Sequence, residues 1–135
     1  MFRVLMATDG SSCALQAAKY VAKMFHDIPD VEIRVLYVNE MSDLEEVKEQ
    51  VEKIKDTALK NTLEYFSSFG YRATGRSAKG NAAEVICSIA EHENFDLVVV
   101  GSCGKGAIKR ALLGSVSYKV VNQAGVPVLV VQEKY

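Results

Sequence analysis

The chain has 135 residues and a mass of 14.8 kDa, a length at which we expect a single domain over residues 1–135. Its 16 basic and 17 acidic side chains give a net charge of −1, which argues against general nucleic-acid binding because that binding depends on clustered Lys and Arg. Its apolar runs are shorter than the ~20 residues of a membrane span and its N-terminus does not resemble a secretory signal, so we expect a cytoplasmic protein without a membrane partner.

Hydrophobic periodicity divides the chain into alternating strands and helices. Apolar residues that recur at spacings of three and four predict helices, and short continuous apolar runs predict strands covered on both faces. The expected elements, in chain order, are strand 3–8, helix 14–25, strand 31–38, helix 44–66, strand 71–77, helix 82–90, strand 97–100, helix 115–124 and strand 128–131. This βαβαβαβαβ order predicts an α/β fold with a doubly wound, five-stranded parallel sheet of the Rossmann-like type.

Two segments rich in glycine and small polar residues follow the first and the fourth strand. The first segment is Asp9–Ser12, directly after Thr8, and the second begins at Gly101, directly after Val100. Ligands of open α/β sheets bind outside the carboxyl ends of the strands, where the strand order reverses. If the first and fourth strands are neighbours, both segments border one cleft, and we predict a binding site there.

Three glycines of the second segment have the placement of an anion-binding loop. Gly101 and Gly104 lie three residues apart at the strand exit, and Gly114 precedes the helix that starts at Ser115. Glycine lets backbone amides approach a ligand closely, and the first amides of a helix attract phosphate. The candidate phosphate ligands at this helix start are the amides and hydroxyls of Ser115, Val116 and Ser117.

Positive charge is concentrated in the same loop, at Lys105, Lys109 and Arg110. Together with the glycines, these residues predict a cradle for the phosphates of a nucleotide. The alternative is a purely structural role, because glycines also end strands and cap helices. Two standard nucleotide motifs do not fit: Gly106 follows Lys105 where a Walker loop needs Ser or Thr, and the first turn lacks the glycines of a dinucleotide fingerprint.

The spacing of these residues resembles the ATP-binding signature of the universal stress protein family, G-x-x-G, nine residues, then G-[ST]. The matching residues are Gly101, Gly104, Gly114 and Ser115. The early TDGS stretch at 8–11 and the closing PVLVV at 127–131 are also similar to that family. The resemblance covers essentially the whole chain, and it implies a single universal stress protein domain with the fold of the adenine nucleotide alpha hydrolase-like proteins.

The resemblance also implies how the nucleoside would be held. In ATP-binding members, backbone atoms at the positions matching Ala7 and Val38 contact the adenine, and the carboxylate matching Asp9 contacts the ribose. Some members have proline where this chain has Ala7, a difference that leaves a backbone contact intact. The residues alone allow another role for Asp9, because Asp is also a common helix cap.

For the phosphates, the resemblance implies contacts from the loop and from the following helix. The residues matching Gly101, Gly104 and Lys105 enclose the ribose and phosphates, and a divalent metal, Mg or Mn, is bound through the phosphates. The phosphate tail is held by the residues matching Ser115, Val116 and Ser117. Cys103 stands where Arg or His is common in the family, so one phosphate contact is missing; Cys103 is either an ordinary loop residue or a redox-sensitive thiol beside Lys105.

The function implied is that of an ATP-binding universal stress protein, a nucleotide-dependent sensor or signalling module in the stress response. We recognise no catalytic base directed at the phosphates, so we assign no catalytic residues and expect any ATP hydrolysis to be slow. The alternative is an enzyme, a slow metal-dependent ATP hydrolase or phosphotransferase that uses the same pocket. A third possibility is a dimerisation module whose pocket holds no ATP.

The last strand predicts a protein partner. Val128–Val131 is wholly apolar, and in this topology we expect it at an edge of the sheet. An apolar edge strand favours pairing with a strand of another chain. The family resemblance implies the same outcome, a homodimer formed by antiparallel pairing of this strand.

Overall fold

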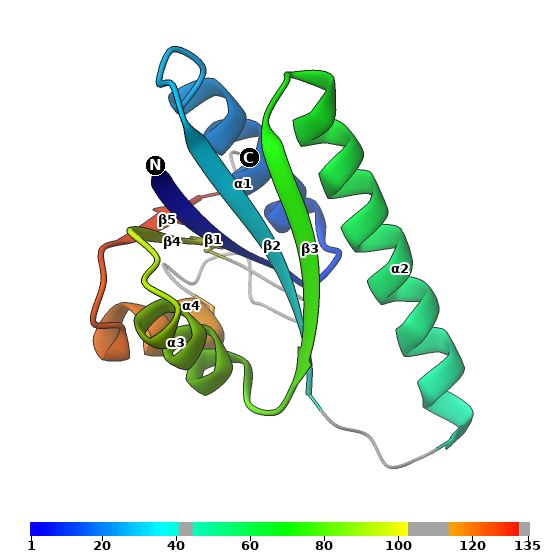
Figure 1. Cartoon of the computed structure of the whole chain (residues 1–135). Coiled ribbons are helices and arrows are strands. Elements are labelled where there is room, and N and C mark those ends of the chain that lie inside the picture. Colours follow the sequence, from blue (N-terminus) through cyan, green and yellow to red (C-terminus); the bar gives the residue numbers. More distant parts are fainter. Residues whose placement is uncertain (41–44, 103–113, 133–135) are drawn as a thin grey trace.

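The computed structural model describes residues 1–40, 45–102 and 114–132, which alternate between strands and helices (Figure 1). The elements are β1 (Phe2–Thr8), α1 (Ser12–Met24), β2 (Val31–Asn39), α2 (Glu45–Ser68), β3 (Arg72–Lys79), α3 (Ala82–His92), β4 (Leu97–Gly101), α4 (Ser115–Gln123) and β5 (Val128–Val131). The predicted order of elements is confirmed. β3 runs two residues further than predicted, because its pairing with β2 continues as far as Asn39 and Lys79. Among the described helices, none has the length and hydrophobicity needed to cross a membrane.

The five strands form one parallel sheet in the order β3-β2-β1-β4-β5. Strands β2 and β3 are added on one side of β1, and the chain then crosses to the other side of β1 to add β4 and β5. The strand order therefore reverses between β1 and β4, which confirms the doubly wound fold. Helices α1 and α2 cover one face of this sheet, and α3 and α4 cover the other (Figure 1).

The continuous apolar runs of the strands fill two separate cores. Successive side chains of β1 point to opposite faces, so Val4 and Met6 pack with α1 and α2, whereas Leu5 packs with α3 and α4. All three side chains are fully buried. The two covered faces explain why the strands lack the alternation of apolar and polar residues that a half-exposed strand shows.

Candidate functional site

The turn after β1 is closed by its own polar side chains. The Thr8 hydroxyl accepts a hydrogen bond from the Gly10 amide (3.2 Å), and the Asp9 carboxylate accepts one from the Ser11 amide (2.9 Å). Ser11 is the N-cap of α1, since its hydroxyl accepts the Ala14 amide at 3.3 Å. Gly10 has φ +82°, a left-handed conformation that favours glycine. The chain therefore passes from β1 into α1 within a few residues, and the turn stays at the carboxyl end of β1.

Asp9 is half-buried beside β2, and it does not cap α1 itself, because Ser11 does so. Burial raises the pKa of the Tyr37 hydroxyl in β2, the negative charge of Asp9 raises that pKa further, and the positive charge of Lys55 in α2 opposes this rise. Asp9 directly follows Thr8, which is opposite Tyr37 in the register of β1 and β2, so Asp9 lies at the edge of the sheet where these two strands end. The structure thus gives Asp9 a role in the turn and also leaves it at the predicted site.

Ala7 and Val38 lie near this same edge, on the face of the sheet that α3 and α4 cover. Both are half-buried and pack against the same apolar cluster. Ala7 is opposite Leu36 in the register of β1 and β2, so Val38 lies two residues further toward the carboxyl end. The structure therefore brings together the two positions for which the family resemblance implies adenine contacts.

Gly101 ends β4 in close contact with the first turn of α1. A Cβ atom added at Gly101 would lie 3.2 Å from the carbonyl oxygen of Cys13 and 3.3 Å from its carbonyl carbon. Because both of these atoms belong to the backbone, a side chain at this position would force α1 and β4 apart. Gly101 thus has a packing reason to be glycine, independent of any ligand.

The start of α4 is bound to the end of β4. The Gly114 amide donates a hydrogen bond to the carbonyl oxygen of Ser102, and the Ser102 amide donates one to Val131 of β5 (2.9 Å). The Ser117 hydroxyl, which is almost fully buried, donates to the carbonyl oxygen of Gly101. These bonds place the first turn of α4 beside the exit of β4, with Ser115 exposed.

The N-terminus of α4 is capped differently from those of α1 and α3. Gly114 is its N-cap and supplies no side-chain hydrogen bond, whereas Ser11 caps α1 and Asn81 caps α3 through their side chains. The amides of Ser115 and Val116 at this helix start carry the positive end of the helix dipole. The predicted phosphate ligands of α4 therefore lie at the exit of β4, although the Ser117 hydroxyl is already bonded within the protein.

Two predicted site residues, Gly104 and Lys105, lie outside the described residues, as do Cys103, Lys109 and Arg110.

Glu40, which directly follows β2, is a further polar residue at this edge that the sequence analysis did not single out. Its carboxylate accepts a hydrogen bond from the Ala82 amide at the start of α3 (3.1 Å). Glu40 therefore adds a second carboxylate, after Asp9, at the carboxyl edge of the sheet. Its position directly after the second predicted strand could have identified it, because the carboxyl ends of all strands of a parallel sheet lie along this edge.

These features define a class of protein: a Rossmann-like α/β fold with its candidate site at the reversal of strand order, between a polar turn after β1 and a glycine-capped helix after β4. The model of the universal stress protein family matches residues 1–132. The chain belongs to the universal stress protein family, as the signature residues predicted.

Similar proteins match over nearly the full length of the chain. Universal stress protein MJ0531 of Methanocaldococcus jannaschii is 31% identical, and the match covers 97% of this chain and 82% of that protein. The solved structure of MJ0577 from the same organism is 30% identical with a TM-score of 0.88, covering 98% of this chain and 96% of the other. A universal stress protein family member from Arabidopsis thaliana, solved with AMP bound, shares the fold at 17% identity, with a TM-score of 0.77 and coverage of 99% and 93%.

Proposed function

We propose that this protein binds ATP where the strand order reverses between β1 and β4, and that it acts as a nucleotide-dependent sensor or signalling module in the stress response. The observation that carries this proposal is the meeting of the signature residues Gly101, Gly114 and Ser115 at one strand exit. The hydrogen bonds from Gly114 to Ser102 and from Ser117 to Gly101 support that arrangement. The bound AMP of the Arabidopsis thaliana neighbour supports an adenine nucleotide as the ligand.

The nucleoside is proposed to lie across the ends of β1 and β2. Ala7 and Val38 supply backbone contacts to the adenine, next to apolar side chains of the α3 and α4 face. Asp9 accepts hydrogen bonds from the ribose hydroxyls, since a carboxylate is an acceptor-only group that suits two neighbouring hydroxyl donors. The turn that holds Asp9 is closed by Thr8 and Ser11, so the carboxylate is positioned before the nucleotide arrives.

The phosphates are proposed to lie at the N-terminus of α4. A glycine N-cap adds no side-chain oxygen there, and the amides of Ser115 and Val116 offer donors that an anion can accept. Ser117 takes part as a positioning residue, because its hydroxyl holds the helix against Gly101. Gly104 and Lys105 belong to the proposal through the family resemblance, and Mg or Mn accompanies the nucleotide through its phosphates.

The nucleotide that the purified protein carries tests this proposal. We expect denaturation to release an adenine nucleotide that absorbance and mass spectrometry identify. We also expect Mg-ATP to raise the melting temperature, because a ligand at 100 times its Kd adds about 2.7 kcal/mol to the free energy of unfolding. A parallel titration with Mg-GTP separates adenine recognition from phosphate binding. The absence of both a released nucleotide and a shift with Mg-ATP would falsify the proposal.

We also propose that β5 pairs with β5 of a second copy to form a homodimer. β5 is at one edge of the sheet, and its residues Val128–Val130 are half-buried although apolar. The carbonyl oxygens of Pro127 and Val131 accept hydrogen bonds from the amides of Val98 in β4 and of Ser102 directly after it. Because pairing alternates along a parallel strand, the amides of Val128 and Val130 point away from β4, toward the open edge. Among the described residues no strand pairs with that edge, which supports pairing with a strand of a second copy.

Replacing Val130 by proline tests this pairing, because proline removes an outward amide without removing a bond to β4. We expect light scattering to give the wild type twice the chain mass of 14.8 kDa and Val130→Pro the mass of one chain. Val130→Thr is the matched control, because it keeps both the amide and a β-branched side chain. A wild type that is monomeric at high micromolar concentration, or a Val130→Pro variant that remains dimeric, contradicts the proposed pairing.

A further inference from the structure

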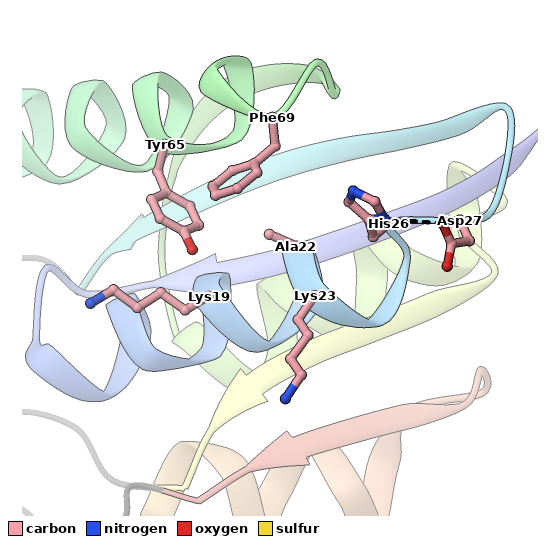
Figure 2. Close-up of a pocket in the computed structure, with 7 residues that line it drawn as sticks. All are labelled: Lys19, Ala22, Lys23, His26, Asp27, Tyr65 and Phe69. Carbon is pink, nitrogen blue, oxygen red and sulfur yellow. Dashed lines mark hydrogen bonds and ion pairs between the residues drawn. The ribbon is translucent and has the colours of Figure 1, made fainter.

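A groove of about 360 Å³ lies between the C-terminal parts of α1 and α2, away from the candidate nucleotide site (Figure 2). We call it the α1–α2 groove, and it is lined by Lys19, Ala22, Lys23, His26, Asp27, Tyr65 and Phe69. α1 has 13 residues, which corresponds to about 20 Å of helix. The nucleotide site is proposed at the N-terminal end of α1 and the groove is at the other end, so the two are separate surfaces.

One wall of the groove is aromatic. The rings of Tyr65 and Phe69 have centroids 5.1 Å apart, and Phe69 is 53% exposed. Both side chains lie over Ala22 of α1 (Figure 2). The Tyr71 hydroxyl donates a hydrogen bond to the Ala22 carbonyl oxygen at 2.5 Å, which ties α1 to the chain that follows α2. The groove therefore has a fixed apolar surface that is open to a partner.

The other wall carries positive charge. Lys19 and Lys23 are one turn apart on α1, and their amines extend away from the aromatic rings (Figure 2). Neither forms an ion pair within residues 1–40, 45–102 and 114–132, and Asp27 is hydrogen-bonded to the His26 ring at 3.0 Å. Lysine stems cover apolar surface while their charged ends stay in water. The result is an apolar groove whose rim carries two lysines and one acidic residue, Asp27, and so has an excess of positive charge.

We propose that the α1–α2 groove docks a segment of a partner protein that combines an apolar side chain with acidic residues. The apolar side chain packs against Tyr65 and Phe69, since exposed aromatic residues are common anchors of interfaces. The acidic residues of the segment lie against Lys19 and Lys23, and this charge complementarity selects acidic over basic segments. Such a surface gives a signalling protein a place to contact a partner without covering its nucleotide site.

A phage library of random short peptides tests the docking surface when it is panned against the full chain. We expect the recovered peptides to combine acidic residues with an aromatic or aliphatic residue. Their affinity, measured by fluorescence anisotropy, falls at least ~10-fold in the double variant Lys19→Glu/Lys23→Glu. Lys60→Glu is the matched control, because Lys60 is an exposed lysine of α2 outside the groove, and it leaves the affinity unchanged.

Phe69→Ala provides a second variant that removes the apolar anchor and leaves the charges in place. We expect it to weaken the same peptides at least ~5-fold. Circular dichroism melts of all variants confirm that the altered side chains, which are exposed, leave the fold intact. The proposal is overturned if no peptide prefers the wild type to the double variant, if the recovered peptides are basic or uncharged, or if anionic vesicles bind the groove while peptides do not.

Discussion

Replacing Phe66 by alanine is expected to lower the free energy of unfolding by about 3–5 kcal/mol. Phe66 of α2 is fully buried in the core that α1 and α2 form with the sheet, and its ring contacts the Tyr71 ring edge-on, with centroids 5.8 Å apart. Removing the ring leaves a cavity between α2 and the sheet that the surrounding strands cannot fill. This loss is a large part of the roughly 5–15 kcal/mol that stabilises a domain of ordinary size.

Urea unfolding followed by circular dichroism measures this effect, and Phe69→Ala is its matched control. Phe69 lies three residues further along and is 53% exposed, so its truncation is expected to change the stability by less than about 1 kcal/mol. The same control variant is expected to bind the peptides of the α1–α2 groove more weakly, which separates stability from docking at this end of α2. Equal losses of stability in the two variants contradict the burial described for Phe66.

Replacing Ser115 by glutamate is expected to weaken ATP binding at least ~30-fold, because the new carboxylate lies where the phosphates are proposed to bind. The free energy of unfolding, in contrast, is expected to increase in this variant. An acidic residue in the first turn of a helix interacts favourably with the helix dipole and adds about 0.3–1 kcal/mol. Ser115 is exposed, so the larger side chain does not disturb the packing.

Ser115→Gln is the matched control, since glutamine has the size of glutamate without its charge. Isothermal titration with Mg-ATP is expected to show a smaller loss of affinity for Ser115→Gln than for Ser115→Glu, and melting curves should show both variants folded. If glutamate and glutamine lower the ATP affinity equally, the negative charge at this helix start does not repel the nucleotide. The phosphates would then lie elsewhere.

The fold could be predicted from the sequence because its strands are short apolar runs covered on both faces. Val98, Val99 and Val100 are all buried, yet they alternate between the two cores, so the run has no polar position. Helix starts were also predictable where a capping side chain marks them. Asn81, for example, directly precedes the predicted helix 82–90, and its side chain accepts a hydrogen bond from the Glu84 amide at 3.1 Å.

Features that depend on contacts between distant segments could not be predicted. The bond from Ser117 to Gly101 joins residues 16 apart, and nothing in a serine near a helix start indicates whether its hydroxyl faces a ligand or a neighbouring strand. The α1–α2 groove brings Lys19 and Lys23 beside Tyr65 and Phe69, which are 42 to 50 residues later in the chain. Periodicity identifies the buried stripe of each helix but not which residues border a groove.

Two different physical reasons favour glycine at position 101 of the signature. The sequence left open whether the glycines of the loop are structural or bind a nucleotide. Contact with the Cys13 backbone gives Gly101 a structural reason, and its place at the exit of β4 is also where a nucleotide is proposed to bind. The two roles are compatible, because a close approach of α1 to β4 also shapes the proposed site.

The most direct measurement of nucleotide binding is a calorimetric titration of the full chain, freed of any bound nucleotide, with Mg-ATP. We predict saturable, equimolar binding by the wild type, tighter for Mg-ATP than for Mg-GTP, and at least ~30-fold weaker in Ser115→Glu. Saturable binding with equal affinity for Mg-ATP and Mg-GTP, and with an affinity that Ser115→Glu leaves unchanged, contradicts the proposed site. A wild type that shows no saturable binding of Mg-ATP contradicts the proposed function itself.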